Sequence, residues 1–398
     1  MGTPAWGARG EPAAPLERDD CRAHGARLIS RTRKGSETNS KLASGHTSAM
    51  ARFLVPLALS LCFFGCSKDS PDTAPTPAAP AASGSASTAV APAPAPAKTP
   101  LRVAYSDWPG WTAFEVGIQK GWFKEAGIDV EFSWADYGAT LDNFSAGKAD
   151  AVMVTNGDAL VTGANGAKSK MILLTDYSNG NDKVVGRPGI KSFKDLKGKK
   201  LGLELTLVEQ LLFQKGCEKN GLNPKDVTLV GTKTNDTPQV LGSKQVDAIA
   251  AWYPIASQAL ATVPGSTPLF TSADAPGLIY DSVAVTPTSF AQRHDDWVKF
   301  VKVWYKISDY VRDPKTQPDA VAIMAAKAGA KVEEYQAAMP GTYFLSLAEA
   351  KARYKKGPGL DSLAGSTSVA NDFNIANKVY KDSQNVDEYI DSSIVDSL

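Results

Sequence analysis

The sequence predicts an α/β protein with two lobes. Short apolar strands alternate with amphipathic helices between residues 101 and 175, and the same order begins again after Asp182. From Trp297 onward the pattern becomes mainly helical. Strands and helices that alternate across short turns are typical of a parallel sheet with helices on both sides. The part from Thr99 to Leu398 is long enough for two such lobes.

The first half shows the alternation most clearly. Residues 128–132 alternate between apolar and charged side chains, as a half-buried strand does. Strands are expected at 101–105, 128–132, 149–154 and 171–175, and helices at 113–123 and 140–146.

The second half repeats this plan without a strict sequence repeat. Strands are expected at 200–204, 227–230 and 246–251, and helices at 207–220 and 237–243. After them, Trp297, Phe300, Val301, Trp304 and Ile307 have helical spacing, and 320–328 predicts a further helix. We expect these helices to pack back on the first lobe.

The segment before the folded part has the layout of a bacterial lipoprotein signal. Arg52 is followed by a short apolar run, and the small residue Gly65 precedes Cys66. We expect 50–65 to be removed and Cys66 to be lipidated; the competing interpretation is a buried strand. The run is too short to span a bilayer permanently. Residues 1–49 lack apolar periodicity and are interpreted as an upstream extension, and the start, Met1 or Met50, stays open.

The composition predicts a tether and argues against disulfides, cysteine metal sites and nucleic-acid binding. Residues 66–99 are rich in Ala and Pro, which predicts an extended tether between the lipid and the folded part. Of the four cysteines, only Cys217 falls in the folded part, so we expect neither a disulfide nor a cysteine metal site there. The net charge of +1 and the absence of a basic stripe argue against nucleic acid as a partner.

Four candidate helix caps follow predicted strands. Thr112 and Thr206 each precede a glutamate by three residues, which is the pattern of a capping box. Thr155 is a looser example, and Thr237 precedes a proline at a helix start. Each motif alone is common at the start of a helix and does not indicate a binding site. Together they mark the strand ends where open α/β sheets bind ligands.

The same loops carry many polar and aromatic side chains. Apolar walls with a few placed polar groups are typical of a small-molecule pocket, although any single aromatic residue could instead belong to the core. The candidate ligand-binding residues are Asp107, Trp108, Trp111, Tyr137, Asn156, Asp158, Asp176, Asn179, Asp182, Glu204, Thr206, Trp252 and Asp281.

Several segments resemble one known family. Residues 106–111 (Ser-Asp-Trp-Pro-Gly-Trp) and 121–130 resemble the opening of ABC-transporter substrate-binding proteins of the nitrate/sulfonate/taurine type, in the NMT1/THI5-like superfamily. Residues 144–151, 155–160 and 192–199 continue the likeness. It extends over essentially the whole folded part, and its early block is the most specific.

The resemblance implies a periplasmic binding protein-like type II fold. One lobe would comprise 100–182 with 282–398, and the other 183–281. A small-molecule ligand would lie in the cleft between them, hinge closure would bury it, and the closed form would dock on an ABC permease. It implies no cofactor and no metal. We expect a monomer, held by lipid on Cys66 at the periplasmic side of the cell envelope.

The charges of the candidate residues bear on the ligand. The cleft loops carry seven acids, while the nearest positive side chains in sequence are Lys183, Arg187 and Lys233. Acids beside Trp and Tyr faces suit a small cationic or nitrogen-rich compound. An anion held at helix N-termini is the alternative, although the expected Thr caps would occupy some of those N–H groups.

Two further classes stay open beside a transport protein. Thiamine-pyrimidine synthase-like enzymes resemble this family, but their chemistry consumes a histidine and needs a Cys-rich motif. The only histidine of the folded part is His294, at an expected helix start, and no Ser/His/Asp arrangement or phosphate loop appears, so we expect no enzyme activity. A ligand sensor is the other class, and the sequence does not distinguish it from a transport protein.

Overall fold

The structure is a computed structural model that describes residues 99–398. The predicted extension, the signal, Cys66 and the tether up to residue 98 lie outside the described residues. Within residues 99–398, none of the helices combines the length and the apolar character that crossing a bilayer requires.

The first sheet has six strands in the order β11-β4-β10-β3-β1-β2. They are β1 (Leu101–Tyr105), β2 (Val130–Trp134), β3 (Ala151–Thr155), β4 (Lys170–Ser178), β10 (Tyr280–Val285) and β11 (Thr342–Phe344). β1 runs parallel to β2 and β3, whereas β10 pairs antiparallel with β3 and β4.

The second sheet has five strands in the order β7-β6-β8-β5-β9. They are β5 (Lys183–Gly186), β6 (Lys200–Leu203), β7 (Thr228–Gly231), β8 (Ala248–Ala251) and β9 (Thr267–Thr271). β6 is parallel to β7 and β8, and β5 is antiparallel to β8 and β9. The second sheet therefore repeats the first strand for strand, apart from β11, and we call the elements around each sheet the first and second lobe.

The expectation of purely parallel sheets is wrong for β10 and the short edge strand β11 in the first sheet and for β5 in the second. The chain crossings between the sheets explain β5 and β10. β5 follows the first passage of the chain between the sheets, and β10 follows the second. Each strand begins beside the carboxyl end of a parallel strand: Lys183 pairs with Ala251, and Asp281 pairs with Thr155. A strand entered from that edge has to run away from it, so it lies antiparallel to its neighbour.

The predicted helix 113–123 is two short helices, α2 (Phe114–Gln119) and α3 (Trp122–Glu125), and a further one, α1 (Pro109–Thr112), precedes them. Gly121 separates α2 from α3 with a φ of 71°, a left-handed conformation that glycine adopts without strain. The other helices between the strands of the first lobe are α4 (Tyr137–Ser145) and α5 (Asn156–Ala164).

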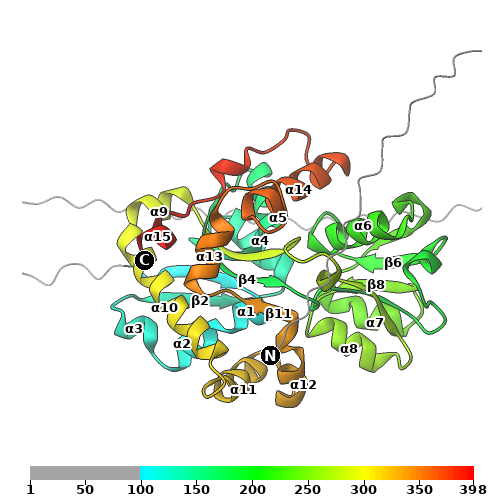
Figure 1. Cartoon of the computed structure of the whole chain (residues 1–398), viewed down its shortest axis with the longest axis horizontal. Coiled ribbons are helices and arrows are strands. Elements are labelled where there is room, and N and C mark those ends of the chain that lie inside the picture. Colours follow the sequence, from blue (N-terminus) through cyan, green and yellow to red (C-terminus); the bar gives the residue numbers. More distant parts are fainter. Residues whose placement is uncertain (1–98) are drawn as a thin grey trace, which may run out of the picture. The chain divides into compact units, whose positions relative to one another are not determined.

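Helices lie on both sides of the second sheet (Figure 1). They are α6 (Val208–Asn220), α7 (Thr237–Gly242) and α8 (Ile255–Thr262). Cys217 of α6 is buried with a free thiol, and burial raises its pKa to about 12, which agrees with a core role.

The C-terminal part packs on the first lobe, as expected (Figure 1). Its helices are α9 (Pro287–Gln292), α10 (His294–Arg312), α11 (Gln317–Ala328), α12 (Val332–Ala338), α13 (Leu347–Tyr354), α14 (Leu363–Ala376) and α15 (Ser393–Ser397). The apolar face of α10 buries Trp297, Phe300, Trp304 and Ile307 completely. Trp304 stacks on Phe114 of α2 with 4.6 Å between ring centroids, which fixes α10 against the first sheet's helices.

Only one of the four predicted caps forms. Thr155 Oγ1 accepts from the Asp158 N–H at the start of α5. The other three predictions are wrong: Thr112 lies at the end of α1, Thr237 donates to the Thr234 carbonyl, and Thr206 donates to the Leu205 carbonyl. The N-termini of α2, α6 and α7 therefore have no side-chain cap.

Candidate functional site

A small cavity lies between the lobes, at the carboxyl ends of the parallel strands. Its free volume is only about 10 Å³, room for about one water molecule, and it is lined by Trp108, Trp111, Tyr137, Thr155, Asp182, Val208, Trp252, Ile279 and Asp281. Six of these are candidate ligand-binding residues from the sequence. The lobes are thus closely apposed here, and a solute larger than water would enter only if they part.

Aromatic rings form most of the wall. Trp111 stacks on Tyr137 with 5.4 Å between ring centroids, and Trp252 meets the same tyrosine edge-on at 5.4 Å. Carboxylates orient two of the indoles: Trp108 Nε1 donates to Asp176 at 2.9 Å, and Trp252 Nε1 donates to Asp107 at 3.0 Å. The rings are thus held in place before any ligand arrives.

Two carboxyl groups face each other beside the cavity, of which Asp281 lines it and Asp176 does not. Asp176 of β4 and Asp281 of β10 are paired in the register of the first sheet, and both are buried. Each has one oxygen, Oδ2, without a hydrogen-bond partner. Gly110 makes room for the pair, since a Cβ at that position would lie 1.7 Å from Asp176 Oδ2.

Burial raises the pKa of every carboxyl group in this cluster. The pKa of Asp107 and Asp182 rises to about 6, and that of Asp158 and Asp176 to about 7. For Asp281, burial and then the neighbouring Asp176 raise the pKa well above its usual value.

No lysine or arginine of the described part forms an ion pair with these acids. Within residues 99–398, the lysine and arginine ion pairs do not include any of the five aspartates. Among the described residues, Lys183 is the one cation whose charge acts on them: it lowers the pKa of Asp182, but burial leaves that pKa raised overall, and burial lowers the pKa of Lys183 itself. The cavity is therefore acidic and desolvated.

Hydrogen bonds across the cavity connect the two lobes. Asp107 of the first lobe accepts from Trp252 of the second, and Asp136 accepts from Asn235 at 2.5 Å. Asp158 accepts from Tyr137 at 2.8 Å, and the Val208 N–H of the second lobe lowers its pKa, although burial raises that pKa overall.

The remaining candidates lie outside the cavity lining. Asn156 is buried and donates to Ser366 and Thr367 of α14, so it connects α5 to the C-terminal part. Asn179 donates to the Pro340 carbonyl. Glu204 accepts from Thr234, and Thr206 is exposed.

Three lining residues were not among the candidates. Thr155 and Val208 both lie inside the predicted capping motifs, which was a signal available in the sequence. Ile279 has no such signal, because it belongs to the passage between the sheets that precedes the unpredicted strand β10.

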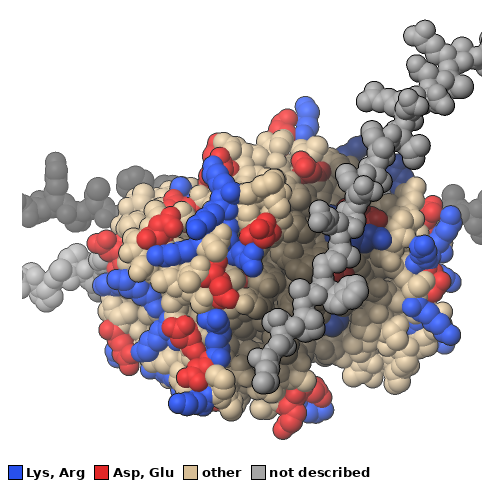
Figure 2. All heavy atoms as spheres, in the orientation of Figure 1, with Lys and Arg blue, Asp and Glu red and all other residues tan. Residues whose placement is uncertain are grey.

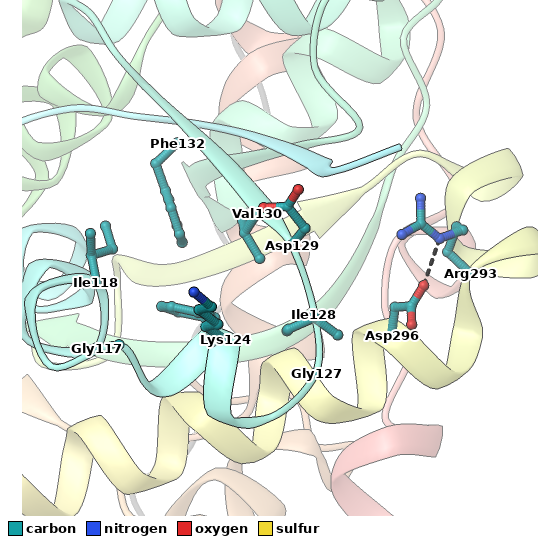
Figure 3. A pocket seen from close by; sticks show the side chains of 12 residues that line it. Gly117, Ile118, Lys124, Gly127, Ile128, Asp129, Val130, Phe132, Arg293 and Asp296 are labelled. Carbon is teal, nitrogen blue, oxygen red and sulfur yellow. Dashed lines mark hydrogen bonds and ion pairs between the residues drawn. The ribbon is translucent and has the colours of Figure 1, made fainter. Parts of the chain in front are cut away.

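A larger surface hollow of about 760 Å³ lies elsewhere in the first lobe (Figure 3). Asp129 and Val130 of its lining lie at the start of β2, the end opposite the inter-lobe cavity. Its charged pair Arg293 and Asp296 is already satisfied at 2.6 Å. On the face shown in Figure 2, acidic and basic side chains are interspersed. The inter-lobe cavity is thus the better candidate site.

Two sheets of equivalent topology with a cavity at their facing strand ends define the periplasmic-binding-protein fold. Residues 108–316, more than half of the chain, match the sequence profile of the family described as NMT1/THI5 like, and the chain belongs to that family.

Individual relatives agree with this assignment. A putative binding protein of Brucella abortus (strain 2308) is 29% identical over 177 residues, which cover 44% of this chain and 54% of the relative. The chain thus spans about half the length of the curated relatives it matches.

Two solved structures share the fold at 14% identity. The alkanesulfonate-binding protein SsuA of Xanthomonas axonopodis pv. citri, bound to MOPS, has a TM-score of 0.62 and covers 75% of this chain and 100% of its own. The desulfurization enzyme DSZB has a TM-score of 0.54, with 74% and 98% covered. One is a binding protein and the other an enzyme, so at this identity the likeness shows the fold alone.

Proposed function

We propose that this protein is the solute-binding component of an ABC importer and that it captures a small cationic or nitrogen-rich compound without turning it over. The observation that carries the proposal is a cavity walled by Trp108, Trp111, Tyr137 and Trp252, with buried carboxyl groups that no lysine or arginine of residues 99–398 pairs. Aromatic faces and desolvated carboxylates together attract an organic cation.

The geometry favours an organic cation over a metal ion. Within the described residues, no three histidine, cysteine or acidic side chains converge closely enough to hold a metal ion. The lobes formed by 100–182 with 282–398 and by 183–281 would close on the solute, and the closed form would dock on a membrane permease. The binding-protein relatives support the class, and the rival solute is an anion of the kind SsuA binds.

Calorimetric titration tests the ligand class. At pH 8 we expect methylguanidine or tetramethylammonium to bind at least 100-fold more tightly than taurine or nitrate, because this pH lies above the pKa values of about 6 to 7 for Asp107, Asp158, Asp176 and Asp182. Mass spectrometry of the recovered solute should show it unchanged. Tight binding of taurine or nitrate alone would contradict the charge argument, and a converted solute would contradict the absence of catalysis.

We further propose that the protein is a monomer anchored by lipid on Cys66 at the periplasmic face of a membrane. The proposal rests on the signal-like segment 50–65 and its Gly65-Cys66 junction. In cells fed a labelled fatty acid, we expect label on the wild-type protein and none on Cys66→Ala. Cys62→Ala is the matched control and should keep the label. Equal labelling of Cys66→Ala and the wild type would reject this anchor.

A further inference from the structure

Helix α6 begins at the cavity wall without a cap of its own. Its first residue, Val208, lines the cavity, and the preceding Leu207 supplies no side-chain cap. Thr206, one residue earlier, has a φ of 69° and donates its hydroxyl to the Leu205 carbonyl. The start of this 13-residue helix therefore presents backbone N–H groups and partial positive charge, which favour a negative group.

The carboxylate of Asp158 supplies that negative group from the other lobe. Asp158 lies in the first turn of α5, is 3% exposed, and follows Thr155, which lines the cavity together with Val208 at the start of α6. The Val208 N–H lowers the pKa of Asp158, although burial raises that pKa overall. Tyr137 donates to the same carboxylate at 2.8 Å and so fixes its orientation. Gly157 shows how closely the helices approach, since a Cβ there would lie 3.8 Å from Leu211 of α6.

We propose that Asp158 is a specificity-determining residue that keeps anionic solutes out of the cavity. Its carboxylate fills the position at which α6 would otherwise hold an anion, so an incoming anion has to displace a buried group of its own charge. This inference rests on the proposed function and deepens it, because it names the residue that makes the site selective against anions.

Neighbouring charges strengthen the exclusion. Glu204 and Glu209 of the second lobe, both on the α6 side of the cavity, interact electrostatically with Asp158. Glu209 is fully buried, and its Oε2 has no hydrogen-bond partner. An anion at the start of α6 would therefore meet carboxylates from both lobes, whereas a cation would be attracted to all of them.

The test is calorimetric titration of nitrate and taurine into the full-length protein at pH 8. Asp158→Ala and Asp158→Ser both remove the carboxylate, so either variant carries the test if the other folds poorly. We expect at least one anion to bind tenfold or more tightly to these variants than to the wild type. Asp158→Asn keeps an acceptor at the α6 start without the charge, and we expect a gain below threefold. Asp142→Ala, an exposed change in the same lobe, is the control for nonspecific effects.

The outcomes separate this inference from the proposed function. If the wild type binds methylguanidine and a folded Asp158→Ala or Asp158→Ser variant gains no anion affinity, the role of Asp158 is rejected and the proposed function stands. If the wild type itself binds taurine or nitrate tightly and ignores the cations, both are rejected. An equal gain in Asp158→Asn and Asp158→Ala would show that charge is not the cause, which also rejects the inference.

Discussion

Asp281→Asn is expected to make the ligand-free protein more stable and to weaken binding of a cation at least 30-fold. Asp281 is 2% exposed, faces Asp176 across the sheet, and has one oxygen without a partner. Removing an acid that the fold holds so unfavourably should raise the free energy of unfolding by about 2 kcal/mol. The same change takes a buried negative partner away from a bound cation, and losing one member of a buried charge pair typically weakens binding by about 2–5 kcal/mol.

The pH dependence of this gain follows from the raised pKa values. A carboxyl group whose pKa is higher in the folded than in the unfolded protein stabilises the fold at low pH, and this stability is lost as the pH rises toward the folded value. Asp158 and Asp176 titrate at about 7, against about 4 for a free aspartate. Wild-type stability should therefore fall between about pH 4 and pH 7. Because burial and Asp176 raise the pKa of Asp281 as well, the gain from Asp281→Asn should be larger at high pH than at low pH.

Denaturant unfolding at pH 4.5 and pH 8, together with titration of methylguanidine, measures both effects. Asp309→Asn, an exposed change on α10, is the matched control and should leave stability and binding unchanged. Two results would contradict the interpretation: unaltered cation affinity in Asp281→Asn, or lower stability of that variant at both pH values.

The repeated α/β plan was visible in the sequence because its central strands are continuous apolar runs. β3 and β8 are completely buried, and a strand buried on both faces leaves that signature whatever its neighbours are. The antiparallel strands β5 and β10 were missed, because their role depends on where the chain crosses between the lobes. That crossing depends on pairing between residues that are far apart in the sequence, such as Asp281 of β10 and Thr155 of β3.

The sequence also predicted part of the candidate site: it indicated several lining residues but not how the helix starts are capped. Trp108, Trp111 and Trp252 were found because they follow strands, and such loops meet at one edge of a sheet. The local motifs were less informative about detail. Thr206 has the spacing of a cap, yet its hydroxyl donates to the Leu205 carbonyl, and the carboxylate whose pKa the Val208 N–H lowers is Asp158 of the other lobe, a neighbour that no local pattern encodes.

Gly110→Ala is expected to cost about 3 kcal/mol or more of stability, because the added methyl group collides with Asp176. The new Cβ would lie 1.7 Å from Asp176 Oδ2, and this side chain is completely buried. Moving it would also break its hydrogen bond from Trp108 Nε1, so overpacking and a lost buried hydrogen bond add together. Denaturant unfolding at pH 8 measures the loss, and methylguanidine affinity should fall with it as the indole is released.

Gly138→Ala is the matched control, since it adds the same methyl group in a helix of the same lobe. Its nearest atom would be Glu204 Oε1 at 3.4 Å, an ordinary contact, so we expect a change within about 1 kcal/mol. The collision is tested directly by Gly110→Ala in an Asp176→Ala background, where the obstructing carboxylate is gone. There the glycine change should cost less than about 1 kcal/mol, which gives a large coupling energy between the two positions. If the two substitutions were additive, Gly110 would matter for its own backbone and not for the carboxyl pair it accommodates.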